Sequence, residues 1–116
     1  MPKDATENSD AKLCSAAIEL VAAERKRQIE KEGWEPSHDD GHTNGALARA
    51  AGCYAVPPDT RARLVKGTMG DMFVIDWMWP FDEEWWKPSP DDRIRELVKA
   101  GALIVAEIER LQRLQD

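Results

Sequence analysis

The sequence lacks the short motifs that mark many catalytic and phosphate-binding sites. It contains no glycine-rich loop of the GxGxxG or GxxxxGK(S/T) type and no GxSxG nucleophile motif. Its two cysteines, Cys14 and Cys53, stand far apart without a CxxC companion, so we expect two reduced, small core residues and no disulfide. An enzyme that acts through a nucleophilic side chain is therefore not expected.

Long apolar runs and an excess of basic residues are also missing. No run of about eighteen apolar residues exists, which excludes a transmembrane helix. The polar, acidic start MPKDATENSD is unlike a secretory signal, so we expect a cytosolic protein. The net charge is −6 at pH 7 and the isoelectric point is about 4.9. This charge argues against extended nucleic acid as a partner, because such binding needs a basic surface.

Helical patterns dominate the 116 residues, which are enough for one domain. We expect residues 1–9 to be a disordered tail and residues 10–116 to be a single helical domain. Apolar spacings of three and four residues predict one long helix over about 10–32 and a second over DDRIRELVKAGALIVAEIERLQRLQ. The alanine-rich NGALARAAGCYA predicts a short inner helix between them. The fold class is therefore mostly α, with a tryptophan- and proline-rich irregular segment.

The C-terminal helix shows the clearest periodicity. Its apolar residues form one continuous face, made of Ile94, Leu97, Val98, Gly101, Ile104, Val105, Ile108 and Leu111. Gly101 lies in the middle of this helix, at a cost of about 1 kcal/mol relative to alanine. We therefore expect another helix to cross closely at Gly101.

The irregular segment holds most of the tryptophans. Four of the five, Trp77, Trp79, Trp85 and Trp86, lie within ten residues. In this segment MFVIDWMW could form a short strand or an extended stretch over the core. The tryptophans could cover a small core, or they could offer a stacking surface for a purine or nicotinamide ring, with Lys87 and Arg93 near its phosphates. Because Trp85 and Trp86 are adjacent, we expect one to serve the core and the other a ligand or a partner subunit.

The most polar motif is His38-Asp39-Asp40-Gly41-His42. Histidine and aspartate are ordinary metal ligands, so these four polar side chains are the candidates if the protein binds a metal ion. Gly41, however, disfavours a helix that would bring the two histidines together. Either aspartate could instead cap the next helix. We interpret the motif as a helix-capping loop whose remaining polar atoms line a ligand site, and we predict no cofactor.

The segment ERKRQ, residues 24–28, precedes this motif. On a helix such residues most often form a solvated face with pairing between positions i and i+4, for example Glu24 with Gln28. Alternatively, Arg25 or Arg27 could reach a phosphate, because a guanidinium group binds phosphate through two parallel hydrogen bonds.

The order of the motifs ERKRQ, GW, HDDGH, CYA, WP, WWKP and RELVKAGALIVAEIERL resembles a group of small proteins from temperate phages and prophages, some of them labelled Eaa-like early proteins. The resemblance covers roughly residues 20–112. The position of Ala46 is often acidic in that group. The resemblance implies a phage accessory protein that acts in the cytoplasm of the infected bacterium, and it supplies no mechanism.

We therefore predict an anti-defence protein that binds and sequesters a small, phosphorylated, nucleotide-like signal molecule without catalysis. Arginine and lysine would hold phosphate, tryptophan would stack on the base and the aspartates would accept hydrogen bonds from ribose hydroxyls. The predicted ligand-binding residues are Arg25, Arg27, Trp34, His38, Asp39, Asp40, His42, Trp86 and Lys87.

Two other functions remain open. One is a metal-dependent, all-α nucleotide pyrophosphohydrolase, for which Glu24, Glu30, Asp39 and Asp40 are candidate carboxylates. The ExxE…ExxD spacing of such enzymes is not cleanly present, which weakens this alternative. The other is a protein-interaction module that inhibits a host protein. Exposed tryptophans in so short a chain also hint at a homo-oligomer.

Overall fold

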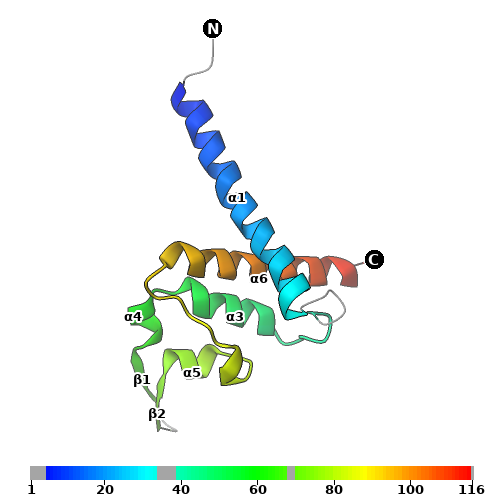
Figure 1. Ribbon diagram of the computed structural model, residues 1–116. Coiled ribbons are helices and arrows are strands. Elements are labelled where there is room, and N and C mark those ends of the chain that lie inside the picture. Colours follow the sequence, from blue (N-terminus) through cyan, green and yellow to red (C-terminus); the bar gives the residue numbers. More distant parts are fainter. Residues whose placement is uncertain (1–4, 34–38, 68–69, 116) are drawn as a thin grey trace.

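Two long helices and one shorter helix form the body of the protein in the computed structural model, which describes residues 5–33, 39–67 and 70–115 (Figure 1). The long helices are α1 (Ala5–Glu32) and α6 (Arg93–Leu114), and the shorter one is α3 (Ala46–Ala55). Between α3 and α6 lie α4 (Pro58–Arg61), β1 (Leu64–Gly67), β2 (Gly70–Phe73), α5 (Val74–Met78) and the 3-10 turn η1 (Glu83–Trp85). The predicted mostly helical fold is confirmed. None of the helices in the described ranges is long and apolar enough to cross a membrane.

The core lies between α3 and α6, which run side by side (Figure 1). Small side chains let the two helices approach closely, and Leu47 and Leu103 fill the space between them. The buried cluster consists of Leu47, Ala50, Ala51, Tyr54, Ala100, Leu103 and Ala106. Trp79, Phe81 and Trp86 pack against this cluster from the irregular segment. Large aromatic side chains thus cover a core that is itself built mostly from alanine.

Helix α1 crosses α6 at Gly101 and then extends well beyond the rest of the protein (Figure 1). A Cβ atom on Gly101 would come within 3.0 Å of Val21 Cγ2, so the close crossing expected at this glycine is present. The side chains of residues 10–20 are all exposed. Cys14 lies on this projecting part and is exposed, so the prediction that it is a core residue is wrong, whereas Cys53 is buried in α3.

The first helix begins earlier than the sequence pattern suggested. Residues 5–9 of the expected disordered tail are helical. They contain neither glycine nor proline, so no residue in this stretch breaks the helix towards the N-terminus.

Most of the apolar face of α6 points away from the core. Helix α3 packs on the opposite face, where Ala100, Leu103 and Ala106 belong to the buried cluster. The larger apolar side chains, among them Leu97, Ile104 and Ile108, are about half exposed. Helix α1 crosses this outer face near Gly101, which leaves much of it open to solvent.

The strand considered for MFVIDWMW is shorter than that segment. Strands β1 and β2 form an antiparallel hairpin that pairs Leu64 with Phe73 and Gly67 with Gly70. The ladder ends near the Val74 N–H, which donates to the Arg63 carbonyl, and α5 follows directly. The residues before Arg63 belong to α4 and offer no strand for the residues after Val74 to pair with, so the backbone of that segment satisfies its hydrogen bonds within α5.

Candidate functional site

A cleft runs between the C-terminal part of α1 and the tryptophan-rich loop before α6. Its wider part, the chamber, has a volume of about 370 Å³. The chamber is lined by Glu32, His42, Leu47, Pro80, Phe81, Asp82 and Trp85. A much smaller pocket beside it, the neck, has a volume of only about 20 Å³, enough for about one water molecule. It shares Glu32 and Trp85 with the chamber and is lined further by Glu24, Arg27, Gln28, Tyr54, Lys87, Lys99 and Leu103. The chamber alone falls within the usual size range of small-molecule sites.

Aromatic and apolar side chains form most of the chamber wall. Phe81 contacts the edge of the His42 ring, with the ring centroids 4.9 Å apart. Leu47 forms the floor, and Trp85, which is 41% exposed, stands at the rim. Two carboxylates, those of Glu32 and Asp82, interrupt this apolar surface. The chamber therefore suits a flat, mostly apolar ring with one or two N–H donors.

The two adjacent tryptophans point to different places. Trp86 packs on Tyr54 and Trp79, at centroid distances of 4.7 and 5.0 Å, and the Arg61 guanidinium lies over its ring. Trp85 lines the chamber and the neck. Sequence reasoning chose Trp86 as the ligand-binding residue, whereas the structure places Trp85 at the cleft.

Hydrogen bonds fix the loop just after these tryptophans. The Lys87 N–H donates to Tyr54 Oη over 3.2 Å, and Lys99 Nζ donates to the Lys87 carbonyl over 2.8 Å. Tyr54 comes from α3 and Lys99 from α6, so both core helices hold the loop in place. The rim of the cleft is therefore tied to the core, although the loop has little regular secondary structure.

Two lysines give the neck positive charge. Lys87 Nζ lies 5.7 Å from the centre of the Trp85 ring, and Lys99 Nζ lies 5.5 Å from that of Tyr54. Burial, and after it the positive charge of Arg95, lower the pKa of Lys99. Within the described residues neither lysine forms an ion pair. A bound anion would stabilise both ammonium groups.

Gln28 brings a buried polar group without a partner into the neck. Its side chain is only 3% exposed, and its Nε2 donates to Glu24 Oε2 over 3.3 Å. Its Oε1 has no hydrogen-bond partner in the part of the chain that the structure describes. A buried acceptor left unpaired costs about 1–3 kcal/mol. The neck has room for about one water molecule, so this carbonyl oxygen is suited to accept a hydrogen bond from a bound water that could bridge to a ligand.

Arg27, also in the neck, is held between two carboxylates. It lies 2.8 Å from Glu24 and 3.0 Å from Glu32. Glu24 also contacts Arg95 of α6 over 2.7 Å. Burial alone would raise the pKa of Glu24, but the hydrogen bonds and charges of Arg27 and Arg95 lower it. Glu24 and Glu32 thus offset the charge of Arg27, and the two lysines remain as the cations for a ligand.

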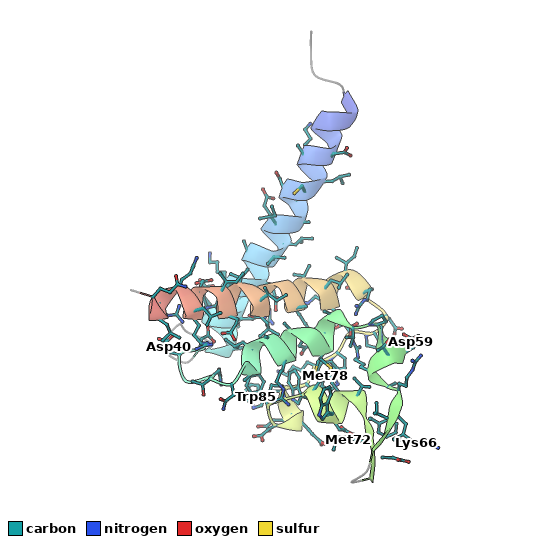
Figure 2. All side chains as sticks on the ribbon, turned by 180° about the vertical axis from the view of Figure 1, so that it is seen from behind. Asp40, Asp59, Lys66, Met72, Met78 and Trp85 are labelled. Atoms are coloured by element: carbon teal, nitrogen blue, oxygen red, sulfur yellow. The ribbon has the colours of Figure 1, made fainter. Side chains whose placement is uncertain are left out.

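The aspartates of the HDDGH motif bind arginines. Asp39 is fully buried and lies 2.8 Å from Arg25, and Asp40 lies 2.6 Å from Arg113. Figure 2 shows Asp40 beside the C-terminal end of α6. None of these four residues lines the chamber or the neck. The expected capping role is wrong, because α3 has Gly45 at its N-cap, with a φ angle of 71°, and no side-chain cap.

Of the nine predicted ligand-binding residues, the structure places three at the cleft: Arg27 and Lys87 in the neck and His42 in the chamber. Trp34 and His38 lie outside the described residues. The sequence predicts Gln28 only as a partner of Glu24 on a solvated face, and it does not single out Lys99. Gln28 could have been found from spacing, because it lies four residues from both Glu24 and Glu32 on one face of α1, but no local pattern marks Lys99.

The carboxylates considered for a metal-dependent enzyme do not converge. In ranges 5–33, 39–67 and 70–115, no three histidine, cysteine, aspartate or glutamate side chains could hold one metal ion together. Glu24, Asp39 and Asp40 are each engaged by arginine. Glu30 is exposed and lies 4.0 Å from Lys26.

The two neighbouring aspartates should differ strongly in their effect on stability. Asp39→Ala leaves the buried Arg25 without its closest carboxylate, and we expect a loss of about 3 kcal/mol in the free energy of unfolding. Asp40→Ala removes a pair on the surface and should leave the unfolding midpoint nearly unchanged. Urea unfolding of both variants measures the difference, and equal midpoints would contradict a structural role for Asp39.

Comparisons with protein-family models, with curated proteins and with solved structures found no match to this chain.

Proposed function

We propose that this protein binds a small nucleotide-type anion in the cleft and holds it without chemical change. One observation carries the proposal: a chamber with aromatic walls lies beside a neck that is lined by two lysines and by Gln28 with its unpaired carbonyl oxygen. A nucleotide has the same two parts, a flat ring and a phosphate. In a phage-infected bacterium, such a protein would lower the free concentration of a nucleotide signal.

The ring would lie against Trp85 and Phe81. Stacking of a base on an aromatic side chain contributes about 1–3 kcal/mol and tolerates different bases. The carboxylates of Glu32 and Asp82 would accept hydrogen bonds from an amino group or a ring N–H, which favours bases that carry such donors.

The phosphate would lie at the outer edge of the neck, beside Lys87 and Lys99, because the neck itself holds only about one water molecule. Both ammonium groups are within 6 Å of an aromatic ring centre, so their positions are restrained before a ligand arrives. Sequestration fits better than hydrolysis because three of the four candidate carboxylates are engaged by arginine, which leaves them poorly placed to bind Mg²⁺.

The test is thermal unfolding against nucleoside phosphates, cyclic dinucleotides and ADP-ribose derivatives, each with and without Mg²⁺ and each recovered afterwards. A ligand at one hundred times its dissociation constant adds about 2.7 kcal/mol, which raises the midpoint by roughly 10 °C or more for a domain of this size. We expect such a rise without metal and an intact nucleotide. Metal-dependent release of pyrophosphate would show a hydrolase, and no shift with any compound would favour the protein-interaction module.

A pair of lysine variants links that result to the neck. Lys87→Met should remove most of the ligand-induced rise in midpoint. Lys66→Met is the matched control, because Lys66 is an exposed lysine on the β-hairpin, away from the cleft (Figure 2). An equal ligand-induced rise in the unfolding midpoint for both variants would contradict phosphate binding at the neck.

A further inference from the structure

The outer face of α6, which points away from α3, carries a heptad pattern. The pattern consists of Ile94, Leu97, Gly101, Ile104, Ile108 and Leu111, here called the seam, with alternating spacings of three and four residues. This is the a/d spacing of a two-stranded coiled coil, in which such residues are buried against a second helix. Here the five seam side chains are between 46 and 68% exposed.

We propose that the seam is the centre of a homodimer in which two α6 helices pair antiparallel about a two-fold axis. Antiparallel pairing places Ile94 opposite Leu111 of the second copy, and Leu97 opposite Ile108. The central layer places Gly101, whose Cα side is also contacted by Val21 of α1, opposite the branched side chain of Ile104. Every contact is reciprocal, as two-fold symmetry requires, and no seam position is charged.

The projecting part of α1, residues 10–20, supplies the second half of the surface and is called the arm here. Its Leu13, Ile18 and Leu20 are between 50 and 70% exposed. The arm rises on the side of α6 opposite α3, which is the side of the seam (Figure 1). Cys14, Ala17 and Ile18 precede Val21 by seven, four and three residues, so they continue the face with which α1 contacts Gly101.

The length of the arm matches a dimer of this kind. Paired helices lie about 8–10 Å apart, and a helix rises about 1.5 Å per residue. A helix that crosses its own α6 at Val21 therefore reaches the second α6 about six residues earlier, between Cys14 and Ala17. Each arm would span both α6 helices, which explains why α1 extends so far beyond its own fold.

The exposed apolar area approaches what a stable dimer buries. The five seam side chains and Ile18, which lies on the face of the arm that continues from Val21, together expose an area on the order of 600 Å², against the ~800 Å² that each partner buries in a standard interface. This is the upper end of the ~300–600 Å² of the largest apolar patch on a typical monomer. Because the seam is complementary to itself, a second copy of this chain is the occupant we infer.

Light scattering during size-exclusion chromatography at tens of micromolar tests the dimer. We expect twice the 13.1 kDa of one chain. Ile104→Glu and Ile108→Glu should halve this mass with the helical circular dichroism kept. Val65→Glu changes an exposed apolar residue of the hairpin, outside the seam, and should leave the dimer intact. A wild-type mass of 13.1 kDa, or a dimer that survives Ile104→Glu, overturns the proposal.

Disulfide crosslinking tests the antiparallel order. Leu97→Cys and Ile108→Cys are made separately in a Cys14→Ala background, where the remaining Cys53 is buried. After subunit exchange and oxidation, we expect a covalent pair that contains one chain of each variant and almost none within either variant alone. Efficient crosslinking of each variant to itself would show parallel helices and would overturn the antiparallel arrangement.

Discussion

Trp85→Ala is expected to weaken nucleotide binding by about 10- to 100-fold while the protein stays folded. The loss follows from base stacking, which contributes about 1–3 kcal/mol per aromatic ring, where 1.4 kcal/mol corresponds to a tenfold change in affinity. The Trp85 side chain is partly exposed at the rim of the cleft and is not among the aromatic residues that pack on the core cluster. Isothermal titration with the nucleotide found in the thermal panel measures the change.

Trp77→Ala is the matched control for Trp85→Ala. Trp77 is 69% exposed and lies on α5, where it lines neither part of the cleft. We expect its removal to leave the dissociation constant unchanged. Wild-type affinity in the Trp85→Ala variant would exclude stacking on this ring, and an equal loss in both variants would point to a general effect on the fold.

Glu96→Ala is expected to lower the free energy of unfolding by about 3–5 kcal/mol, because it leaves a buried arginine without its partner. The Glu96 side chain is fully buried and accepts hydrogen bonds from Arg61, from Arg93 over 3.0 Å and from the Ser89 N–H over 3.0 Å. These partners come from α4, from α6 and from the loop before α6. The variant thus disrupts the junction of three segments, and urea unfolding measures the loss.

The same carboxylate should make stability depend on acid. Burial alone would raise the pKa of Glu96, but the hydrogen bonds of Arg61, Arg93 and the Ser89 N–H lower it. A lowered folded-state pKa stabilises the protein fully above the unfolded-state value of about 4.3, and this contribution is lost as the pH falls through the folded-state pKa. Glu96→Ala should therefore be less sensitive to pH below that value than the wild type. Glu30→Ala, on the exposed face of α1, is the control and should behave like the wild type at every pH.

Local sequence patterns predicted the helices well, because helix formation depends on periodicity and on glycine and proline. They predicted burial less well. On α6 the large apolar side chains formed the clearest stripe, yet α3 packs on the face that carries Ala100, Leu103 and Ala106. An apolar stripe indicates that a helix face is buried in a contact. It does not indicate whether the residues that bury it belong to the same chain.

The site was harder to predict because its residues meet only through the fold. Arg25 and Asp39 are fourteen residues apart, and their buried ion pair follows from the path of the chain after α1. Lys99 joins the neck through the crossing of α6 with α1, which no local motif encodes. Of the two adjacent tryptophans, only the packing of Trp86 on Tyr54 and Trp79 decides which one serves the core.

The crossing at Gly101 has a mechanical consequence for α1. Val21 marks the contact point, with Leu13 eight residues to one side and Gln28 seven residues to the other. At about 1.5 Å per residue, the two lengths are roughly 12 and 10 Å. If α1 tilts about this contact as a rigid helix, its two ends move in opposite directions by similar distances. A tilt that moves Leu13 by one ångström moves Gln28, and with it the wall of the neck, by almost as much in the opposite direction.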